Sequence, residues 1–158
     1  MTTLSFLGAI DTVTGSRYLV RDGTTSLLVD CGLLQGPKKL RERNWQRPPG
    51  DVAALDAVVL THAHIDHSGY LPRLCKAGYK GPIYCTSGTR DLLQLLLPDA
   101  GHLQEEEAEH ANRAHYSRHH PALPLFTRED AERCLPQLVV VERHVPVRCG
   151  TATATFQR

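Results

Sequence analysis

Residues 57–69 read Ala57-Val-Val-Leu-Thr-His-Ala-His-Ile-Asp-His-Ser-Gly69 and place four metal-binding side chains directly after a short apolar run. The run has the length and the continuous apolar character of a strand that is buried on both faces of a sheet. Imidazole and carboxylate groups suit Zn²⁺ and related divalent ions. A site that uses them without cysteine is typical of catalysis, where one coordination position stays open to water. The candidate ligands are His62, His64, Asp66 and His67.

The spacing of these ligands predicts two neighbouring metal ions. Side chains alternate along an extended strand end, so His62 and His64 can point the same way, whereas Asp66 and His67 lie beyond a turn and approach from another side. The alternative is that these are polar loop residues, with Asp66 or Ser68 capping a helix. That alternative requires four ligand-type side chains to gather at a strand end by chance.

Length and composition describe one globular domain. The chain has 158 residues, of which 41% are apolar, and this is compatible with a packed core and excludes a wholly disordered chain. Eighteen Lys and Arg face seventeen Asp and Glu, for a formal charge of +1. Overall charge therefore favours neither a nucleic acid nor an acidic partner, and any electrostatic argument has to be local.

Cysteine usage and hydropathy favour a cytoplasmic protein with no membrane partner. The five cysteines form an odd set with no C-x-x-C pair, which disfavours both a disulfide framework and a thiolate zinc site. No apolar run approaches the ~20 residues of a membrane span. The first residues carry no basic group before their short apolar stretch, so they do not resemble a secretory signal.

Apolar runs, turn residues and capping signals predict an α/β chain. Residues 31–50 are expected to form a long loop with one helical turn, because glycines and prolines surround a basic, polar centre. Strands are expected at 4–7, 18–20, 26–30, 57–61, 82–86, 138–141, 145–148 and 151–156. Helices are expected at 71–77, from 87 to about 113 with a kink at Pro98, and from 127 to about 135.

The stretch 62–69 resembles the H-x-H-x-D-H signature of the metallo-β-lactamase fold superfamily. Upstream, Gly8-Ala-Ile-Asp-Thr-Val-Thr-Gly-Ser16 and Val29-Asp-Cys-Gly-Leu-Leu-Gln-Gly36 resemble its β-CASP branch, the RNA-processing nucleases related to the cleavage-and-polyadenylation endonuclease. Downstream, residues 71–74, 78–84, 104–113 and 124–131 are similar to the same branch. The resemblance implies an αββα sandwich, and the two upstream segments carry the narrower assignment.

Carried over to this chain, the resemblance implies that His62 and His64 bind one zinc ion, that Asp66 and His67 bind a second, and that Asp30 supports the ligands from beneath. A turn residue at the end of a strand is the alternative for Asp30. Two such ions suit hydrolysis of a phosphodiester by an activated water, whose proton Asp66 could accept as the catalytic carboxylate. Thioester or lactam hydrolysis fits the same motif.

Local charge favours RNA as the substrate. Five basic residues against Glu42 alone give a local charge of +4 over residues 38–47, in the loop that the resemblance places near the site. Trp45 or Tyr70 could stack a base, and Ser16 could offer a hydroxyl at the cleft. The alternative is an ordinary solvated loop with Trp45 partly buried. The candidate RNA-binding residues are Ser16, Lys38, Lys39 and Arg41.

The remaining histidines are expected to be solvated. One E-x-x-H motif, Glu107 to His110, lacks the partner motif that a di-iron bundle needs. His144 lies between two strand-like runs, away from the turn in which the family has its next ligand. The other histidines on or after the acidic helix are His102, His115, His119 and His120.

We expect residues 1–158 to be the N-terminal part of a metallo-β-lactamase domain, comprising the first sheet and its helices. The third metal-binding His, the bridging Asp and the inserted β-CASP domain of the family would lie beyond Arg158. Two alternatives stay open: another hydrolase of the superfamily, such as a thioesterase, and a catalytically incomplete metal- or RNA-binding module. Formation of a homo-oligomer is also left open.

Overall fold

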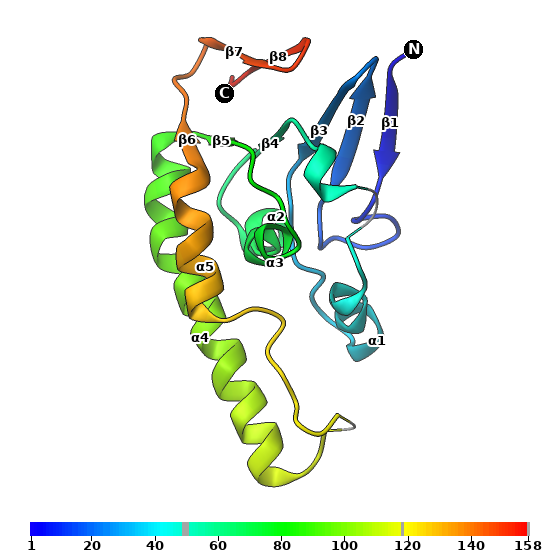
Figure 1. Ribbon diagram of the computed structural model, residues 1–158, viewed down its shortest axis with the longest axis vertical. Coiled ribbons are helices and arrows are strands. Elements are labelled where there is room, and N and C mark those ends of the chain that lie inside the picture. The colour runs from blue at the N-terminus through cyan, green and yellow to red at the C-terminus, as the bar shows by residue number, and fades with distance from the viewer. Residues whose placement is uncertain (49–50, 118, 158) are drawn as a thin grey trace.

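The computed structural model describes residues 1–48, 51–117 and 119–157, and its main feature is a six-stranded sheet (Figure 1). β1, β2 and β3 form an antiparallel meander, and β4, β5 and β6 continue parallel to β3, in chain order across the sheet. A separate hairpin is formed by β7 and β8. The strands are β1 (Thr3–Phe6), β2 (Tyr18–Asp22), β3 (Thr25–Val29), β4 (Ala57–Val59), β5 (Ile83–Cys85), β6 (Leu138–Val140), β7 (Pro146–Cys149) and β8 (Ala152–Thr155).

Helices supply the crossovers that parallel strands need. α3 lies between β4 and β5 in the chain, and α4 followed by α5 leads from β5 to β6. α4 and α5 lie side by side along one flank of the molecule in Figure 1, and α3 packs on α5. The helices are α1 (Lys38–Arg41), α2 (Ile65–Ser68), α3 (Leu71–Lys76), α4 (Ser87–Ala114) and α5 (Arg128–Cys134), with 3₁₀ turns at Glu42–Trp45, Val52–Ala54 and Leu135–Gln137.

The main core lies between the sheet and these helices. Val58, Leu60 and Ile83 alternate toward this face and are fully buried, together with Leu93 of α4 and Phe126 before α5. Burial of each large apolar side chain of this kind stabilises the fold by about 1.5–3 kcal/mol. The prediction of a strand buried on both faces is confirmed in β4, because the side chains on both of its faces are covered.

The opposite face of the sheet is covered only in part. Leu27 and Ala57 are buried against Cys149 of the β7–β8 hairpin. On β1, Leu4 and Phe6 belong to this same face by register and are 54% and 56% exposed. The described residues thus form one sheet with helices on one face, as the prediction of an incomplete αββα sandwich requires.

The expected elements are present; the structure adds 3₁₀ turns at Val52–Ala54 and Leu135–Gln137 and differs in two larger respects. α4 begins at the predicted cap Thr86 and runs through Pro98 without interruption. Thr127 and Asp130 form a complete capping box at the start of α5, as predicted. The differences are that residues 38–45 form α1 and a 3₁₀ turn instead of a single helical turn, and that the one-turn helix α2 is absent from the sequence-based prediction.

The topology brings the candidate ligands to one edge of the sheet. β3 and β4 are parallel neighbours, with Val29 opposite Val59. Their carboxyl ends therefore lie side by side, and the residues that follow each strand meet there. Asp30 follows β3, and the segment 61–68 follows β4.

Candidate metal centre

Asp30 forms the floor of the site, where its carboxylate is almost fully buried. The residue has φ +57°, a left-handed conformation that Asp tolerates better than most residues, and this turns the chain out of β3. Its backbone N–H donates to the carbonyl of Val59, 2.9 Å away, which ties it to β4. The carboxylate is thereby held beneath the segment that carries the candidate ligands.

Hydrogen bonds to this carboxylate assign the tautomer of His67. Asp30 Oδ1 accepts from the Thr61 backbone N–H at 2.8 Å. Asp30 Oδ2 lies 2.8 Å from Nδ1 of His67. Because an ionised carboxylate can only accept, the proton is on Nδ1 and the lone pair of His67 Nε2 is free.

Thr61 fixes the tautomer of His62 in a similar way. Its hydroxyl lies 2.9 and 3.0 Å from the two Asp30 oxygens and 2.9 Å from His62 Nδ1. The single hydroxyl proton is donated to Asp30, so the Thr61 oxygen accepts from His62 Nδ1–H. His62 Nε2 is therefore unprotonated as well, and one buried carboxylate orients two imidazoles, His67 directly and His62 through Thr61.

The free nitrogen of His62 faces His64. His62 Nε2 and His64 Nδ1 are 3.1 Å apart. Two nitrogens bound at about 2.0–2.1 Å to one tetrahedral zinc stand roughly 3.3 Å apart, so this separation suits a shared ion. The pKa of His62 is lowered, first by partial burial and then by the neighbouring imidazoles of His67 and His64, which keeps the ring neutral and able to act as a ligand.

The second pair lies on α2. Asp66 Oδ2 and His67 Nε2 are 3.7 Å apart, and both side chains are about three-quarters buried. The rings of His62 and His67 have centroids 4.1 Å apart, so the two pairs are neighbours. The hydroxyl of Ser68 donates to the carbonyls of Ala63 and His64 and holds the turn closed.

A close backbone contact positions α2. Gly32 approaches Asp66 so tightly that a Cβ atom on Gly32 would lie 1.6 Å from the Asp66 carbonyl oxygen. The same carbonyl accepts from the Ser16 backbone N–H at 2.8 Å. Cys31 N–H donates to the carbonyl of His67 at 2.7 Å. The loop after β3 and the segment just before β2 thus hold in place the turn that carries two of the candidate ligands.

The donor chemistry fits a divalent metal, with two protein ligands available per ion. The four side chains supply nitrogen and oxygen donors and no thiolate, which suits Zn²⁺ in a hydrolytic site. Among the described residues, however, no group of three or more His, Cys, Asp or Glu side chains is placed to enclose an ion. The geometry is therefore that of two converging pairs.

The basic residues predicted to contact RNA are exposed. Lys38, Lys39 and Arg41 lie on α1, which buries none of its own residues. Trp45, in the 3₁₀ turn that follows, is 52% exposed. These side chains are accessible to a ligand.

Two residues from the same prediction are buried. The expectation that Tyr70 stacks a base is wrong, because its ring is buried beneath Arg17 at 3.7 Å from the guanidinium carbon. Ser16 is also buried, and its backbone groups bond to Asp66 and Gly32. The structure thus supports a scaffolding role for Ser16 and gives no support to a contact between its hydroxyl and RNA.

The histidines predicted to be solvated are exposed. His110 stacks against Tyr116 with ring centroids 5.8 Å apart, and His102 lies 3.6 Å from Glu106, one helical turn away. His144 occupies an exposed turn with φ +64° and donates its N–H to the carbonyl of Phe156. None of these contacts involves the candidate metal centre.

Sequence reasoning missed Thr61 and Arg17. Thr61 could have been suspected, because it joins the end of β4 to the first ligand. Arg17 carried no signal, because only the fold shows that it is buried and bonded to the Gly32 carbonyl at 2.8 Å.

Comparison with known proteins identifies the class. A model of the metallo-beta-lactamase superfamily matches residues 10–145, and the chain belongs to this superfamily. The fold agrees. The metallo-beta-lactamase fold protein YhfI from Bacillus subtilis has a TM-score of 0.55 and 22% identity, with 99% of this chain and 52% of that one covered. For the Rm3 metallo-beta-lactamase the TM-score is 0.52 at 16% identity, with 95% and 46% covered.

Relatives of higher sequence identity include a ribonuclease and a transcription termination factor. Ribonuclease TTHA0252 from Thermus thermophilus is 37% identical over 150 residues, which are 94% of this chain and 30% of the ribonuclease. Transcription termination factor FttA from Methanocaldococcus jannaschii is 32% identical over 150 residues, 95% of this chain and 21% of the factor. The chain thus spans less than a third of the length of these curated relatives. Superfamily membership implies a divalent-metal site, for which the 62–67 donor set is the candidate.

Proposed function

We propose that the protein is a zinc-dependent ribonuclease of the β-CASP type, which cleaves RNA phosphodiester bonds with water. The observation that carries the proposal is the pairwise convergence of four nitrogen and oxygen donors above the buried Asp30 carboxylate. The similarity to a ribonuclease supports RNA among the substrates that this superfamily's site could accept. The five cysteines, all free in the structure, support a reducing compartment such as the cytoplasm.

In this proposal two zinc ions are bound, one by His62 and His64 and one by Asp66 and His67. When bound, the ions lower the pKa of a water toward 7 and neutralise charge on the phosphoryl oxygen. Asp66 would be both a ligand and the carboxylate that could accept a proton from the attacking water. Asp30 keeps His67 and, through Thr61, His62 in the tautomers that leave Nε2 free.

Residues 1–158 then provide one half of the site. We propose that they are the N-terminal part of a metallo-β-lactamase domain. The remaining ligands and the inserted RNA-clamping domain belong to the rest of the protein. The exposed basic residues of α1 are suited to hold the RNA backbone, because Lys and Arg contacts with phosphates supply much of the affinity for nucleic acid.

Two other functions are compatible with the donor set. A thioesterase-like hydrolase would use the same ligands on an acyl substrate. A metal- or RNA-binding module without activity would keep the fold and lack turnover. A thioester, a lactam and single-stranded RNA offered to the same preparation distinguish these functions, because only the proposed one yields RNA fragments whose formation requires metal.

The test is made on the intact protein that carries these residues. Replacing His62 and His64 together with Ala should remove one equivalent of zinc, since each change deletes a ligand and not a packing contact. Asp66→Ala should abolish RNA cleavage. The matched control is His102→Ala with His144→Ala, which removes two exposed imidazoles. Elemental analysis showing unchanged zinc in the His62/His64 variant would overturn the ligand assignment.

A further inference from the structure

A second polar feature, which we call the arginine pocket, lies beside the metal centre. It is a cavity of about 170 Å³ between the start of β2 and the segment that contains the 3₁₀ turn after α1. This is several times the roughly 30 Å³ that one water molecule occupies in the liquid, so a tetrahedral oxyanion has room. The lining residues are Leu7, Arg17, Leu34, Arg43, Gln46 and Arg47.

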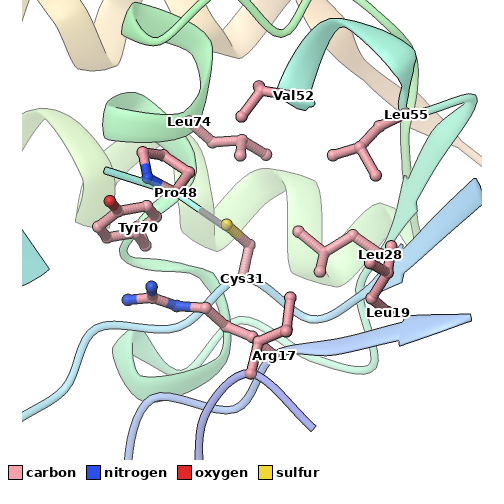
Figure 2. A pocket seen from close by; sticks show the side chains of 10 residues that line it. Arg17, Leu19, Leu28, Cys31, Pro48, Val52, Leu55, Tyr70 and Leu74 are labelled. Atoms are coloured by element: carbon pink, nitrogen blue, oxygen red, sulfur yellow. The ribbon is translucent and has the colours of Figure 1, made fainter. Parts of the chain in front are cut away.

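Arg17 is the fixed element of the pocket. Its side chain is only 7% exposed. Nε donates to the carbonyl of Gly32 at 2.8 Å, and one terminal nitrogen donates to Asn44 Oδ1 at 3.1 Å. The guanidinium also stacks on the ring of Tyr70, and Figure 2 shows it extending toward Tyr70 and away from Leu28. An arginine held in this way loses little conformational freedom when it binds a ligand.

Asn44, which accepts from Arg17, also anchors the 3₁₀ turn to Leu34. Its amide oxygen accepts from Leu34 N–H at 3.0 Å, and its amide nitrogen donates to the Leu34 carbonyl at 2.8 Å. Asn44 is buried although its neighbours in the 3₁₀ turn are exposed. The turn that carries Arg43 is therefore anchored, and the pocket is formed before any ligand arrives.

The positive charges of the pocket lack acidic partners. Within residues 1–48, 51–117 and 119–157, no Asp or Glu lies within 4.0 Å of the charged groups of Arg17, Arg43 or Arg47. The two hydrogen bonds of Arg17 use two of the five N–H groups that a guanidinium carries. Burial lowers the pKa of Arg17, and the nearby Arg43 lowers it further, yet arginine stays protonated in proteins.

We propose that the arginine pocket binds a phosphate group, held by the buried Arg17 together with Arg43 and Arg47. A buried cation without a counter-charge is costly, and an anion that accepts its remaining N–H groups removes that cost. Guanidinium groups bind phosphate oxygens in pairs, with charge-assisted hydrogen bonds about twice as strong as neutral ones. Three arginines line one pocket, and phosphate, with its several anionic oxygens, is the fitting ligand for them.

The pocket is one residue layer away from the metal centre. Arg17 bonds the carbonyl of Gly32, and Gly32 packs directly against the Asp66 backbone. A phosphate in the pocket is therefore separate from the scissile phosphate at the metals and lies beside it. Under the proposed function, on which this assignment of the source rests, it is a neighbouring phosphate of the RNA chain; a free phosphate or nucleotide has the same chemistry.

The first experiment probes phosphate itself. The intact protein is kept metal-free with a chelator, so that phosphate cannot act through the metals, and Tm is measured in inorganic phosphate and in chloride of equal ionic strength. Phosphate should raise Tm by an amount on the order of 2 °C at about ten times its Kd. Arg43→Gln with Arg47→Gln should abolish this rise, since both side chains are exposed and can be replaced without opening the core.

The second experiment identifies the source of the phosphate. Binding of single-stranded RNA is measured against salt concentration for the same double variant. Removing one interaction with a backbone phosphate should reduce the log-log slope by about 0.7. A reduced slope assigns the pocket to the RNA backbone, whereas phosphate stabilisation with an unchanged slope assigns it to free phosphate or a nucleotide.

The matched control is Arg21→Gln with Lys80→Gln, which removes the same charge from exposed positions on other parts of the sheet and its loops. It should leave both the phosphate effect and the slope unchanged.

The proposal is overturned if phosphate and chloride give equal Tm values and the slope is unchanged in the pocket variant. It is also overturned if the control variant is affected as strongly as the pocket variant. The Tm measurement in phosphate requires neither metal nor catalytic activity. Absence of RNA cleavage would therefore count against the proposed function alone.

Discussion

At the scale of single residues, Asp30 matters most, because its one carboxylate accepts hydrogen bonds from three donors. It accepts from the Thr61 backbone, from the Thr61 hydroxyl and from His67, and it is buried while doing so. The alternative interpretation, an ordinary turn residue, does not account for a carboxylate that bonds one candidate ligand, His67, and the Thr61 hydroxyl that bonds another, His62. A left-handed φ at the strand end is what aims the carboxylate there.

Asp30→Asn should weaken zinc binding by about 10–100-fold, the usual cost of disturbing the partner of a ligand histidine. An amide has one acceptor oxygen, so it cannot accept from both Thr61 N–H and His67 Nδ1–H, and its NH₂ group must face one of these donors. Zinc affinity is measured by competition with a chelator. The control Asp99→Asn changes an exposed carboxylate on α4 and should have no effect. Equal affinities in the two variants would contradict the role given to Asp30.

Gly32→Ala should displace α2 and reduce both stability and zinc affinity. The added Cβ would lie 1.6 Å from the Asp66 carbonyl oxygen, so backbone must move at the residue that carries a ligand. The control is Gly88→Ala in the first turn of α4, where the added Cβ meets nothing within 4 Å. That change should be neutral or stabilising by up to about 1 kcal/mol. Thermal unfolding and zinc titration of both variants check the contrast.

At the scale of elements, α1 and the turn after it combine exposed charge with anchored backbone. α1 buries no residue, whereas Asn44 in the next turn is fixed to Leu34. The basic side chains of α1 can therefore be changed without damage to the core, which makes this element suited to testing its interaction with RNA.

Replacing Lys38, Lys39 and Arg41 with glutamine should weaken RNA binding and flatten its salt dependence by about 0.7 log-log units for each phosphate that the protein no longer binds. The control neutralises Arg21, Lys80 and Arg113, which are exposed on other parts of the chain. Fluorescence anisotropy across a salt series provides the slopes. A slope equal to that of the control would leave α1 as ordinary surface.

Relations within one element can be predicted from the sequence, whereas relations between elements often cannot. Spacing alone is enough to place His62 and His64 on one side and Asp66 on a turn, because these relations are local. The link from Asp30 through Thr61 to the ligands is not readable from the sequence, since it requires β3 and β4 to be parallel neighbours. Tyr70 shows the converse error: an aromatic residue beside a motif suggests an accessible ring, but the fold buries it beneath Arg17.

At the scale of the whole molecule, the sheet has two unequal faces. One is covered by α3, α4 and α5, and the other is covered by the β7–β8 hairpin over β3 and β4. Leu4 and Phe6 of β1, and Val139 of β6, remain exposed on the second face. No helix among the described residues is long and apolar enough to cross a membrane.

The uneven coverage of the two sheet faces predicts how residues 1–158 behave when they are produced alone. Only two protein ligands per ion are available in the described part of this segment, whereas a catalytic zinc usually has three. Exposed apolar residues on a sheet face also favour association between copies. We expect the isolated segment to bind zinc weakly, to aggregate and to show no measurable nuclease activity. Zinc titration, light scattering and an RNA cleavage assay make the comparison between the segment and the extended protein that the proposed function requires. Robust zinc-dependent cleavage by the segment alone would contradict this expectation and would require His144 or a second copy of the chain to complete the site.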